Sequence, residues 1–222
     1  MTEAPKIDGI AQVRAVVWDF DGVLNRSGRA QPDGTYRWQR IVAEELGINA
    51  LSMARAVFGR DKRALFTGQE DVLDRLADWA RAEGSDADPE DILELWFEHD
   101  HTPDPDLGRI VETLAQGGLV QVILTNNEAR RARWIAQDAG WADRVDAIFA
   151  SGETGVMKPD AEAFARVEAA LDMAPHELLL IDDSPRNVEA AEKRGWLGWD
   201  YGPGGAMALA QAIMPLLLRA QE

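Results

Sequence analysis

The sequence contains no cysteine, and it has only three histidines and four lysines among its 222 residues. The lack of cysteine excludes disulfides and thiolate metal sites, and so few histidines make a zinc site an unpromising interpretation. A chain of this length can nevertheless bury a core large enough to fold without such links. The composition also fits a reducing compartment.

Positive charge is scarce as well. The chain has 23 Lys and Arg against 39 Asp and Glu, which gives a formal net charge of −16. Nucleic-acid binding depends on basic residues that neutralise phosphates, so we expect no nucleic-acid partner. The same charge opposes an anionic small substrate unless a cation and a local basic group offset it within the site.

Long apolar runs are missing too. Residues 1–13 lack the apolar core of a secretory signal. The apolar stretch from Ala206 to Leu218 is interrupted by Gln211 and Pro215, and it is shorter than the roughly 20 residues of a membrane helix. We therefore expect a cytoplasmic protein without a membrane partner, in which residues 206–218 form a docking helix.

Short apolar runs, each followed by polar residues, are what the sequence does have. Runs that are apolar on both faces are typical of strands covered by helices on both sides of a sheet. The predicted strands are Val13–Trp18, Leu119–Leu124, Ala147–Ala150, Leu178–Ile181 and, more weakly patterned, Leu197–Trp199.

Helical patterns separate these runs, and several of them end at a glycine, which takes the left-handed cap conformation without a Cβ penalty. This alternation predicts a parallel sheet with right-handed crossovers, in a Rossmann-like three-layer α/β core. The predicted helices are Asp106–Gln116, Glu128–Ala139, Ala161–Leu171 and Arg186–Arg194.

The interval after the first strand breaks the alternation, because it is too long for one crossover and contains only helical patterns. We predict a small all-α cap of four helices at residues 27–99, inserted into a core formed by residues 1–26 and 100–222. Three cap tryptophans at helical spacing predict a cap core rather than a ligand-stacking surface. The predicted cap helices are Tyr36–Leu46, Ala50–Val57, Glu70–Ala82 and Pro89–Glu98, and the tryptophans are Trp38, Trp79 and Trp96.

The first polar cluster, Asp19-Phe20-Asp21-Gly22, follows the first predicted strand. Residues two apart in an extended segment point to the same side, so both carboxylates leave the strand together. Ligands bind beyond the carboxyl ends of strands in open parallel sheets, where these residues would lie. An ordinary Asp-Gly turn is the alternative interpretation.

Thr125 and Asn126 follow the second predicted strand. With Glu128, Thr125 forms the Thr-x-x-Glu pattern of a helix capping box, which is the more economical interpretation of this segment alone. The alternative is that the hydroxyl, the amide side chain and the free backbone amides of the next helix bind a phosphate group.

Lys158 and the pair Asp182-Asp183 complete the series. Lys158 precedes a proline, so it should be extended, and Asp160 is placed to cap the following helix. Two adjacent acids at a buried strand end require a cation or a shared proton. Separately these clusters have ordinary explanations, but together they converge on one edge of one sheet and indicate phosphoryl-transfer chemistry.

Four motifs carry a resemblance to a known family. They are Asp-Phe-Asp-Gly-Val-Leu at 19–24, Leu-Thr-Asn at 124–126, Met-Lys-Pro-Asp at 157–160 and Ile-Asp-Asp-Ser at 181–184. With the helical insert after the first motif, the chain closely resembles the haloacid dehalogenase superfamily, in its branch with an α-helical cap. Dehalogenating relatives generally lack the second aspartate of the first motif, so the presence of Asp21 favours phosphate chemistry.

The resemblance implies that Asp19 is the nucleophile and forms an aspartyl-phosphate, while Asp21 acts as general acid and then base. It implies that Thr125, Lys158 and Asn126 hold the phosphoryl group. For the nucleophile loop it implies phosphate contacts by Phe20 and Gly22, and for Mg²⁺ the ligands Asp19, Asp183, the main-chain oxygen of Asp21 and Asp182, the last directly or through a water.

A divalent cation is also required on chemical grounds, because several carboxylates would otherwise repel a phosphate dianion. The prediction is a Mg²⁺-dependent phosphatase for a small phosphorylated metabolite, with sugar phosphates as candidates. The alternatives are a sugar-phosphate mutase, a phosphonatase that uses the cap lysine Lys62 as a Schiff base, and a phospho-receiver-like signalling module. Whether the protein is a monomer or a homodimer is left open.

Overall fold

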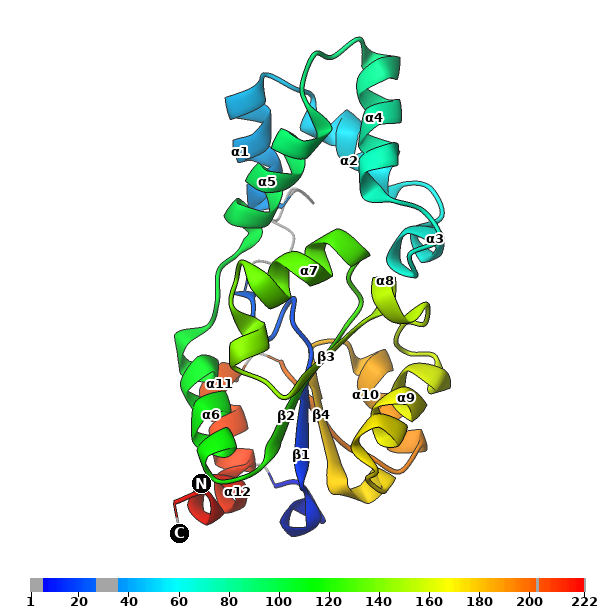
Figure 1. Cartoon of the computed structure of the whole chain (residues 1–222). Helices are drawn as coiled ribbons and strands as arrows, with labels where there is room; N and C mark the ends of the chain where they lie inside the picture. The colour runs from blue at the N-terminus through cyan, green and yellow to red at the C-terminus, as the bar shows by residue number, and fades with distance from the viewer. Residues whose placement is uncertain (1–5, 27–35, 203, 222) are drawn as a thin grey trace.

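The computed structural model describes residues 6–26, 36–202 and 204–221. Its centre is a five-stranded, fully parallel sheet in the order β3-β2-β1-β4-β5 (Figure 1). This confirms the α/β Rossmann-like prediction, and the weakly patterned fifth strand is also present. The strands are β1 (Ala15–Trp18), β2 (Val120–Thr125), β3 (Ala147–Ala150), β4 (Leu178–Asp182) and β5 (Leu197–Asp200).

The central strand β1 explains why the sheet needs helices on both sides. All four of its residues are fully buried. Because side chains alternate across a strand, Val16 and Trp18 enter one apolar cluster, while Ala15 and Val17 enter a second cluster on the opposite face. A strand that is apolar on both faces is stable only when both are covered.

Three helices cover the first face: α6 (Pro105–Gln116), α11 (Gly205–Ala212) and α12 (Met214–Arg219) (Figure 1). The prediction of one helix over residues 206–218 was wrong, because the chain is interrupted at Ile213, which precedes the first turn of α12. Pro215 lies in that first turn, where the missing N–H costs little, whereas in a continuous helix it would break a hydrogen bond.

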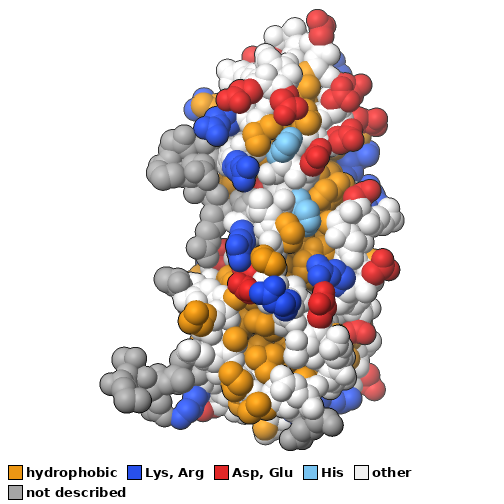
Figure 2. All heavy atoms as spheres, turned by 90° about the vertical axis from the view of Figure 1, so that its left-hand side faces the viewer, with side chains coloured by type: hydrophobic (Ala, Val, Ile, Leu, Met, Phe, Trp, Pro, Cys, Tyr) orange, Lys and Arg blue, Asp and Glu red, His pale blue; other side chains and the backbone are white. Residues whose placement is uncertain are grey.

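Apolar side chains from these helices also reach the surface. Figure 2 shows them gathered over the lower part of this face, where a groove is lined by Met207, Met214 and Leu218 among others. Within the described ranges, no helix combines the length and the apolar character that crossing a bilayer requires.

Helices α9 (Ala161–Leu171) and α10 (Pro185–Lys193) cover the other face, where Phe164 packs edge-on against Trp196. Both helices lie close to their predicted ranges. Above the carboxyl ends of β2 and β3 lie α7 (Ala129–Gln137) and α8 (Ser151–Thr154) (Figure 1). Short 3-10 helices are found at Ile10–Gln12, Trp141–Asp143 and Pro175–Glu177.

Between β1 and α6 the chain forms a separate helical group that lies beyond the carboxyl edge of the sheet (Figure 1). In the described part of this insert there are five helices rather than the predicted four, because the short α3 was not anticipated. Its N-terminus is capped by Asp61, whose side chain accepts from the amides of Arg63 and Ala64. The helices are α1 (Arg37–Leu46), α2 (Ala50–Phe58), α3 (Lys62–Phe66), α4 (Val72–Glu83) and α5 (Pro89–Asp100).

The insert has its own apolar core, which contains all three predicted tryptophans. Trp38 and Trp96 are stacked with ring centroids 4.8 Å apart, and Phe58 packs edge-on against Trp96 at 5.2 Å. We call this group the cap. Its division from the core at residues 27 and 99 stays a prediction, and residues 27–35 lie outside the described chain.

Among the described residues, two partly exposed ion pairs join the cap to the core. Arg63 of α3 pairs with Asp160 at 2.5 Å, and Arg130 of α7 forms a two-pronged contact with Asp71 at 2.7 and 2.8 Å. Asp160 precedes α9 as predicted, but its side chain makes no capping bond, because it is directed to Arg63 instead. Both pairs are partly exposed, so they fix the docking geometry more than they stabilise the fold.

A close backbone approach lies beside these pairs. A Cβ on Gly68 of the cap would lie 2.3 Å from the carbonyl oxygen of Gly152 in α8. Gly84, at the other end of the cap, has a similar left-handed backbone with φ +64°, but nothing lies within 4 Å of its Cβ position. Comparing substitutions at these two glycines therefore separates the cost of backbone strain from the cost of a clash at the cap–core contact.

We predict that Gly68→Ala loosens the docking of the cap, whereas Gly84→Ala does not. Both variants should lose about 1–2 kcal/mol of unfolding free energy from the left-handed backbone. Only Gly68→Ala should raise amide hydrogen exchange in both α3 and α8, because only its methyl group meets the core. Equal exchange in the two variants would show that this contact does not hold the cap.

Candidate active site

The carboxyl ends of the three central strands bring the predicted residues to one place. Trp18 of β1 is in register with Ile181 of β4, and the amide of Asp19 donates to the carbonyl of Ile181 at 2.8 Å. Asp19 therefore lies beside Asp182, the next residue of β4. Thr125, the last residue of β2, ends on the other side of β1.

Lys158 is the cation at the centre of this cluster. Only 2% of its surface is exposed, and its ammonium group binds Asp182 Oδ2 at 2.6 Å and Asp19 Oδ1 at 3.0 Å. Burial alone would lower the pKa of Lys158, but the charges of Asp19 and Asp182 outweigh it and raise that pKa above its ordinary value. The lysine is thus held charged inside the protein.

Asn126 fixes the loop that carries this lysine. Its side chain accepts from the Lys158 amide and donates to the Lys158 carbonyl, both at 2.8 Å. The Asn126 side chain is thus engaged with the Lys158 backbone, and the predicted phosphate contact by Asn126 stays a prediction. Its observed contribution is to link the second and third motifs, which are far apart in sequence.

Asp182 is fully buried, and its two oxygens are occupied by protein donors. Oδ1 accepts from the Ser184 amide and from Asn187 Nδ2, both at 2.9 Å, while Oδ2 accepts from Lys158. Asp182 therefore orients the lysine. Its predicted part in metal binding stays a prediction.

Three carboxylates meet at this point and could hold a metal ion. Asp19, Asp182 and Asp183 each offer an oxygen, and these atoms all lie within 4.8 Å of one another. Burial raises the pKa of Asp19 to about 7, with Lys158 opposing this and Asp182 adding to it. Clustered hard oxygen donors in a buried, strongly negative site fit Mg²⁺.

Gly22 shows how closely the first motif approaches Asp183. Its backbone has φ +93°, and a Cβ there would lie 2.2 Å from Asp183 Oδ2. Only glycine combines that conformation with that proximity. Its amide donates to the Asn25 carbonyl, and the Phe20 amide donates to Asp19 Oδ1. The phosphate contacts predicted for Phe20 and Gly22 stay predictions and require an exchange of these bonds.

Asp21 is held by donors that sequence reasoning missed. Asn25 and Arg131 donate to Oδ1 at 2.8 and 3.1 Å, and Asn127 donates to Oδ2 at 2.9 Å. Burial would raise the pKa of Asp21, but the charge of Arg131 and these hydrogen bonds lower it below its usual value. The carboxylate is therefore fixed in orientation and held ionised.

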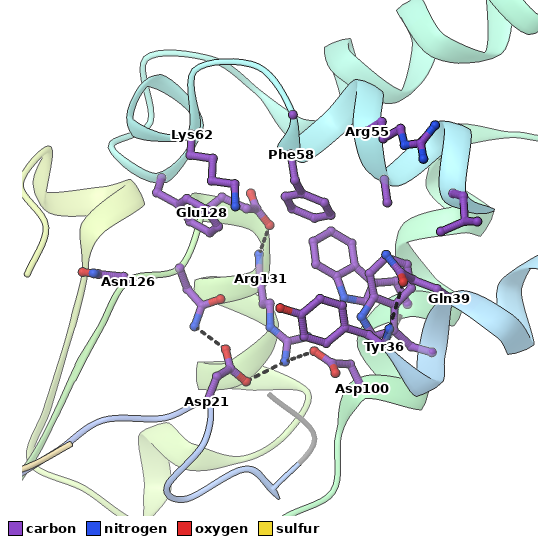
Figure 3. A pocket seen from close by; sticks show the side chains of 17 residues that line it. Asp21, Tyr36, Gln39, Arg55, Phe58, Lys62, Asp100, Asn126, Glu128 and Arg131 are labelled. Carbon is purple, nitrogen blue, oxygen red and sulfur yellow. Dashed lines mark hydrogen bonds and ion pairs between the residues drawn. The ribbon is translucent and has the colours of Figure 1, made fainter. Parts of the chain in front are cut away.

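Arg131 lies between two acids, as Figure 3 shows. It is 2% exposed and pairs with Asp21 and, at 2.8 Å, with Asp100, the last residue of α5. Its Nη1 is buried without a hydrogen-bond partner in the described parts of the chain. We attribute the burial of this charged side chain to its two ion pairs, which offset the cost of leaving one nitrogen without a hydrogen bond.

The segment between β2 and α7 corrects the capping-box interpretation. Helix α7 is capped by Glu128 itself, whose carboxylate accepts from the amides of Arg130 and Arg131. Thr125 takes no part in capping, and its Oγ1 accepts from Asn127 Nδ2 at 2.8 Å. The hydroxyl is thereby oriented at the site edge, beside the residue that also holds Asp21.

A cavity of about 440 Å³ opens above Asp21, between cap and core. In Figure 3 the cap residues Tyr36 and Phe58 project into it, and Lys62 points inwards while Arg55 turns away. Beside this cavity lie the buried carboxylate of Asp19 and the buried ammonium group of Lys158, and the Asp21 carboxylate lines the cavity itself. Groups of these kinds could take part in the transfer of a phosphoryl group to a carboxylate.

Comparison with known proteins agrees with this geometry. Residues 13–195 match the family model described as haloacid dehalogenase-like hydrolase. The chain is 26% identical over 190 residues to the N-acetylmuramic acid 6-phosphate phosphatase of Pseudomonas putida, covering 83% of this chain and 80% of that enzyme. It is 30% identical over 96 residues to the sesquiterpene phosphatase astK of Aspergillus oryzae, covering 43% of this chain and about half, 49%, of that enzyme.

A solved structure shows the same fold. A family enzyme from Bacteroides thetaiotaomicron, crystallised as wild type with magnesium and inorganic phosphate, superposes with a TM-score of 0.64 at 16% identity. The superposition covers 84% of this chain and 93% of that enzyme.

We predict that Arg131→Met destabilises the protein far more than Arg130→Met, although the residues are neighbours in α7. The first change leaves the buried Asp100 and the partly buried Asp21 without their cation, which should cost about 3–5 kcal/mol of unfolding free energy. The second removes a partly exposed pair, worth about 0–1 kcal/mol. Urea unfolding measures both, and similar losses would contradict the central position given to Arg131.

Proposed function

The chain belongs to the haloacid dehalogenase-like hydrolases and is a phosphoric monoester hydrolase, and we propose that it is a Mg²⁺-dependent phosphatase for a small phosphorylated metabolite. In this proposal the enzyme is cytoplasmic and acts through an aspartyl-phosphate on Asp19. The observation that carries the proposal is the buried contact of Lys158 with Asp19 and Asp182. This contact aligns a carboxylate and an ammonium group at the edge of the sheet, below the cavity. Phosphatases of the same family among the relatives support the reaction class.

In the first step an oxygen of Asp19 attacks phosphorus. The new bond joins that oxygen to phosphorus, the bond from phosphorus to the leaving oxygen breaks, and Asp21 supplies a proton to the departing alkoxide. Asp21 lines the cavity in which a leaving group would lie. Because Arg131 favours its charged form, the negative charge of the substrate has to offset that influence before Asp21 carries the proton.

In the second step water attacks the phosphorus of the aspartyl-phosphate. Asp21 takes a proton from that water, inorganic phosphate leaves and the Asp19 carboxylate is restored. A carboxylate that alternates between charged and neutral forms needs a fixed position, and the donors Asn25, Asn127 and Arg131 support one. The same side chain thus serves both steps.

Lys158 and Thr125 are proposed to hold the oxygens of the transferring group. Lys158 is buried and already faces Asp19, so its charge would meet a phosphoryl group without solvent screening. The predicted Mg²⁺ would be held by Asp19, Asp183 and the main-chain oxygen of Asp21, with Asp182 directly or through a water. Bound there, the ion would neutralise the charge that develops around phosphorus.

The position of Lys62 favours a second candidate function, that of a phosphonatase. Lys62 lines the cavity together with Asp21. An amine there could form a Schiff base with an aldehyde phosphonate. Incubation with such a compound and borohydride should then attach a stable adduct to Lys62. If no adduct forms while phosphate monoesters are hydrolysed, the phosphonatase is excluded.

The two remaining alternatives can be distinguished by the product that is formed and by the lifetime of the phosphorylated protein. A sugar-phosphate mutase would interconvert isomers with slow phosphate release, which a product-resolved assay detects. A receiver-like module would keep phospho-Asp19 for minutes to hours without turnover, and membership of a hydrolase family argues against it.

We predict that Asp19→Asn abolishes phosphate release, lowering kcat by at least about 10³-fold. An amide oxygen is a poor nucleophile, although the variant keeps the shape of the site. Asp143→Asn, at an exposed position in the short helix Trp141–Asp143, is the matched control and should retain full activity. Hydrolysis of a broad phosphomonoester panel by Asp19→Asn at the wild-type rate would refute the proposed nucleophile.

We also predict a strict requirement for a divalent cation. Chelation should remove activity and added Mg²⁺ should restore it, and Asp183→Asn should raise the Mg²⁺ concentration for half-maximal rate by about tenfold or more. Titration of activity with Mg²⁺ measures this. Full activity in the presence of a strong chelator would contradict the assignment of these carboxylates.

A further inference from the structure

The cavity above Asp21 has two chemically different sides. Its core side is polar and consists of Asp21, Asn126, Asn127, Glu128 and Arg131, with Asp100 at the end of cap helix α5 beside them. Its cap side carries mainly apolar and aromatic side chains: Tyr36, Trp38, Leu51, Ala54, Phe58, Phe66 and Trp96. A leaving group attached to phosphorus near Asp21 would extend from the polar side towards the apolar side.

Two residues of the apolar side are substantially exposed to solvent. Large apolar side chains with substantial exposure are few among the described residues: Tyr36, Leu51, Met207, Met214 and Leu218. The first two line this cavity, with Tyr36 36% and Leu51 53% exposed, and the other three lie in the groove of α6, α11 and α12. Exposed apolar surface beside a reactive carboxylate indicates a surface that a ligand covers.

This wall is also built to keep its shape. Phe58 packs edge-on against Trp96, which stacks on Trp38 in the cap core. Figure 3 shows Phe58 and Tyr36 projecting into the cavity from different elements of the cap. The packing of Phe58 against this aromatic cluster fixes its part of the wall.

Few polar groups of the cap side are directed into the cavity. Gln39 is buried, and its side-chain oxygen accepts from the Tyr36 amide at 2.9 Å. Arg55 points away from the centre of the cavity, whereas Lys62 is directed inwards and Tyr36 contributes a hydroxyl group (Figure 3). A polyol would therefore exchange its hydrogen bonds with water for contact with hydrocarbon, which is unfavourable.

We propose that the preferred substrates are phosphate monoesters of alcohols with an apolar body, a ring or an alkyl chain, rather than sugar or glycerol phosphates. This inference rests on the proposed function, since it places the leaving oxygen at Asp21. The apolar body then lies against Leu51, Phe58 and Tyr36, while the phosphoryl group stays on the polar side.

A matched substrate series tests the proposal. Propyl, butyl, pentyl and hexyl phosphate, glycerol 3-phosphate and glucose 6-phosphate are all primary alkyl esters, so their leaving groups have similar reactivity. We expect kcat/KM to rise about two- to fourfold with each added methylene, and to be at least about tenfold higher for hexyl phosphate than for either polyol ester. Equal values, or higher values for the polyol esters, would overturn the proposal.

Failure of the proposed function would look different, because no member of the series would then be hydrolysed in a Mg²⁺-dependent way. Hydrolysis of the whole series without a preference for apolar esters would overturn only the present inference.

A pair of variants links the preference to this wall. Leu51→Asn places an uncharged polar group in the cavity, and Leu218→Asn makes the same change at a similarly exposed leucine, 58% against 53%, in the distant groove. We expect Leu51→Asn to lower the ratio of kcat/KM for hexyl phosphate to that for glycerol 3-phosphate by at least about fivefold. Leu218→Asn should leave that ratio unchanged, and an unchanged ratio in Leu51→Asn would overturn the proposal.

Discussion

The contact of one buried ammonium group with two carboxylates is the interaction on which this structure depends. Lys158 binds Asp19 and Asp182 at the ends of two neighbouring strands, and none of the three residues is more than 8% exposed. Removing the lysine would leave two carboxylates without their cation in a site that water barely reaches. The same contact therefore stabilises the fold and positions the reactive groups. Lys158 and Asp19, which neutralise one another, are also the groups that would act on a phosphoryl group.

The parallel sheet makes this contact possible, and the insert gives it a cavity. Strand register places Asp19 beside Asp182, and Asn126 fixes the loop of Lys158 from the end of the next strand. The cap returns to the core at Asp100, which Arg131 connects to Asp21. The residue proposed as acid and base is thus tied to the point where the cap joins the core, so the position of the cap and the orientation of that carboxylate are physically linked.

Much of this arrangement could be predicted from the sequence, because apolar runs followed by polar residues have a direct structural cause. The strand at Ala147–Ala150 was expected at its observed bounds, and the four motifs converge at one edge. Helix α3 was missed because its five residues are too few for a periodic pattern. Arg131 was missed because an arginine-rich helical segment resembles a solvated surface, and because its partner Asp100 is distant in sequence.

The central claim is that Asp19 accepts the phosphoryl group. The most direct measurement is mass spectrometry of peptides from enzyme quenched with acid during turnover, in the Asp21→Asn variant, which should be slow to hydrolyse the intermediate. We expect the mass of one added phosphoryl group on the peptide that contains Asp19, and its removal by hydroxylamine, which cleaves acyl phosphates. A phosphoryl group on any other residue would contradict it, as would steady phosphate release by this variant with no label on Asp19.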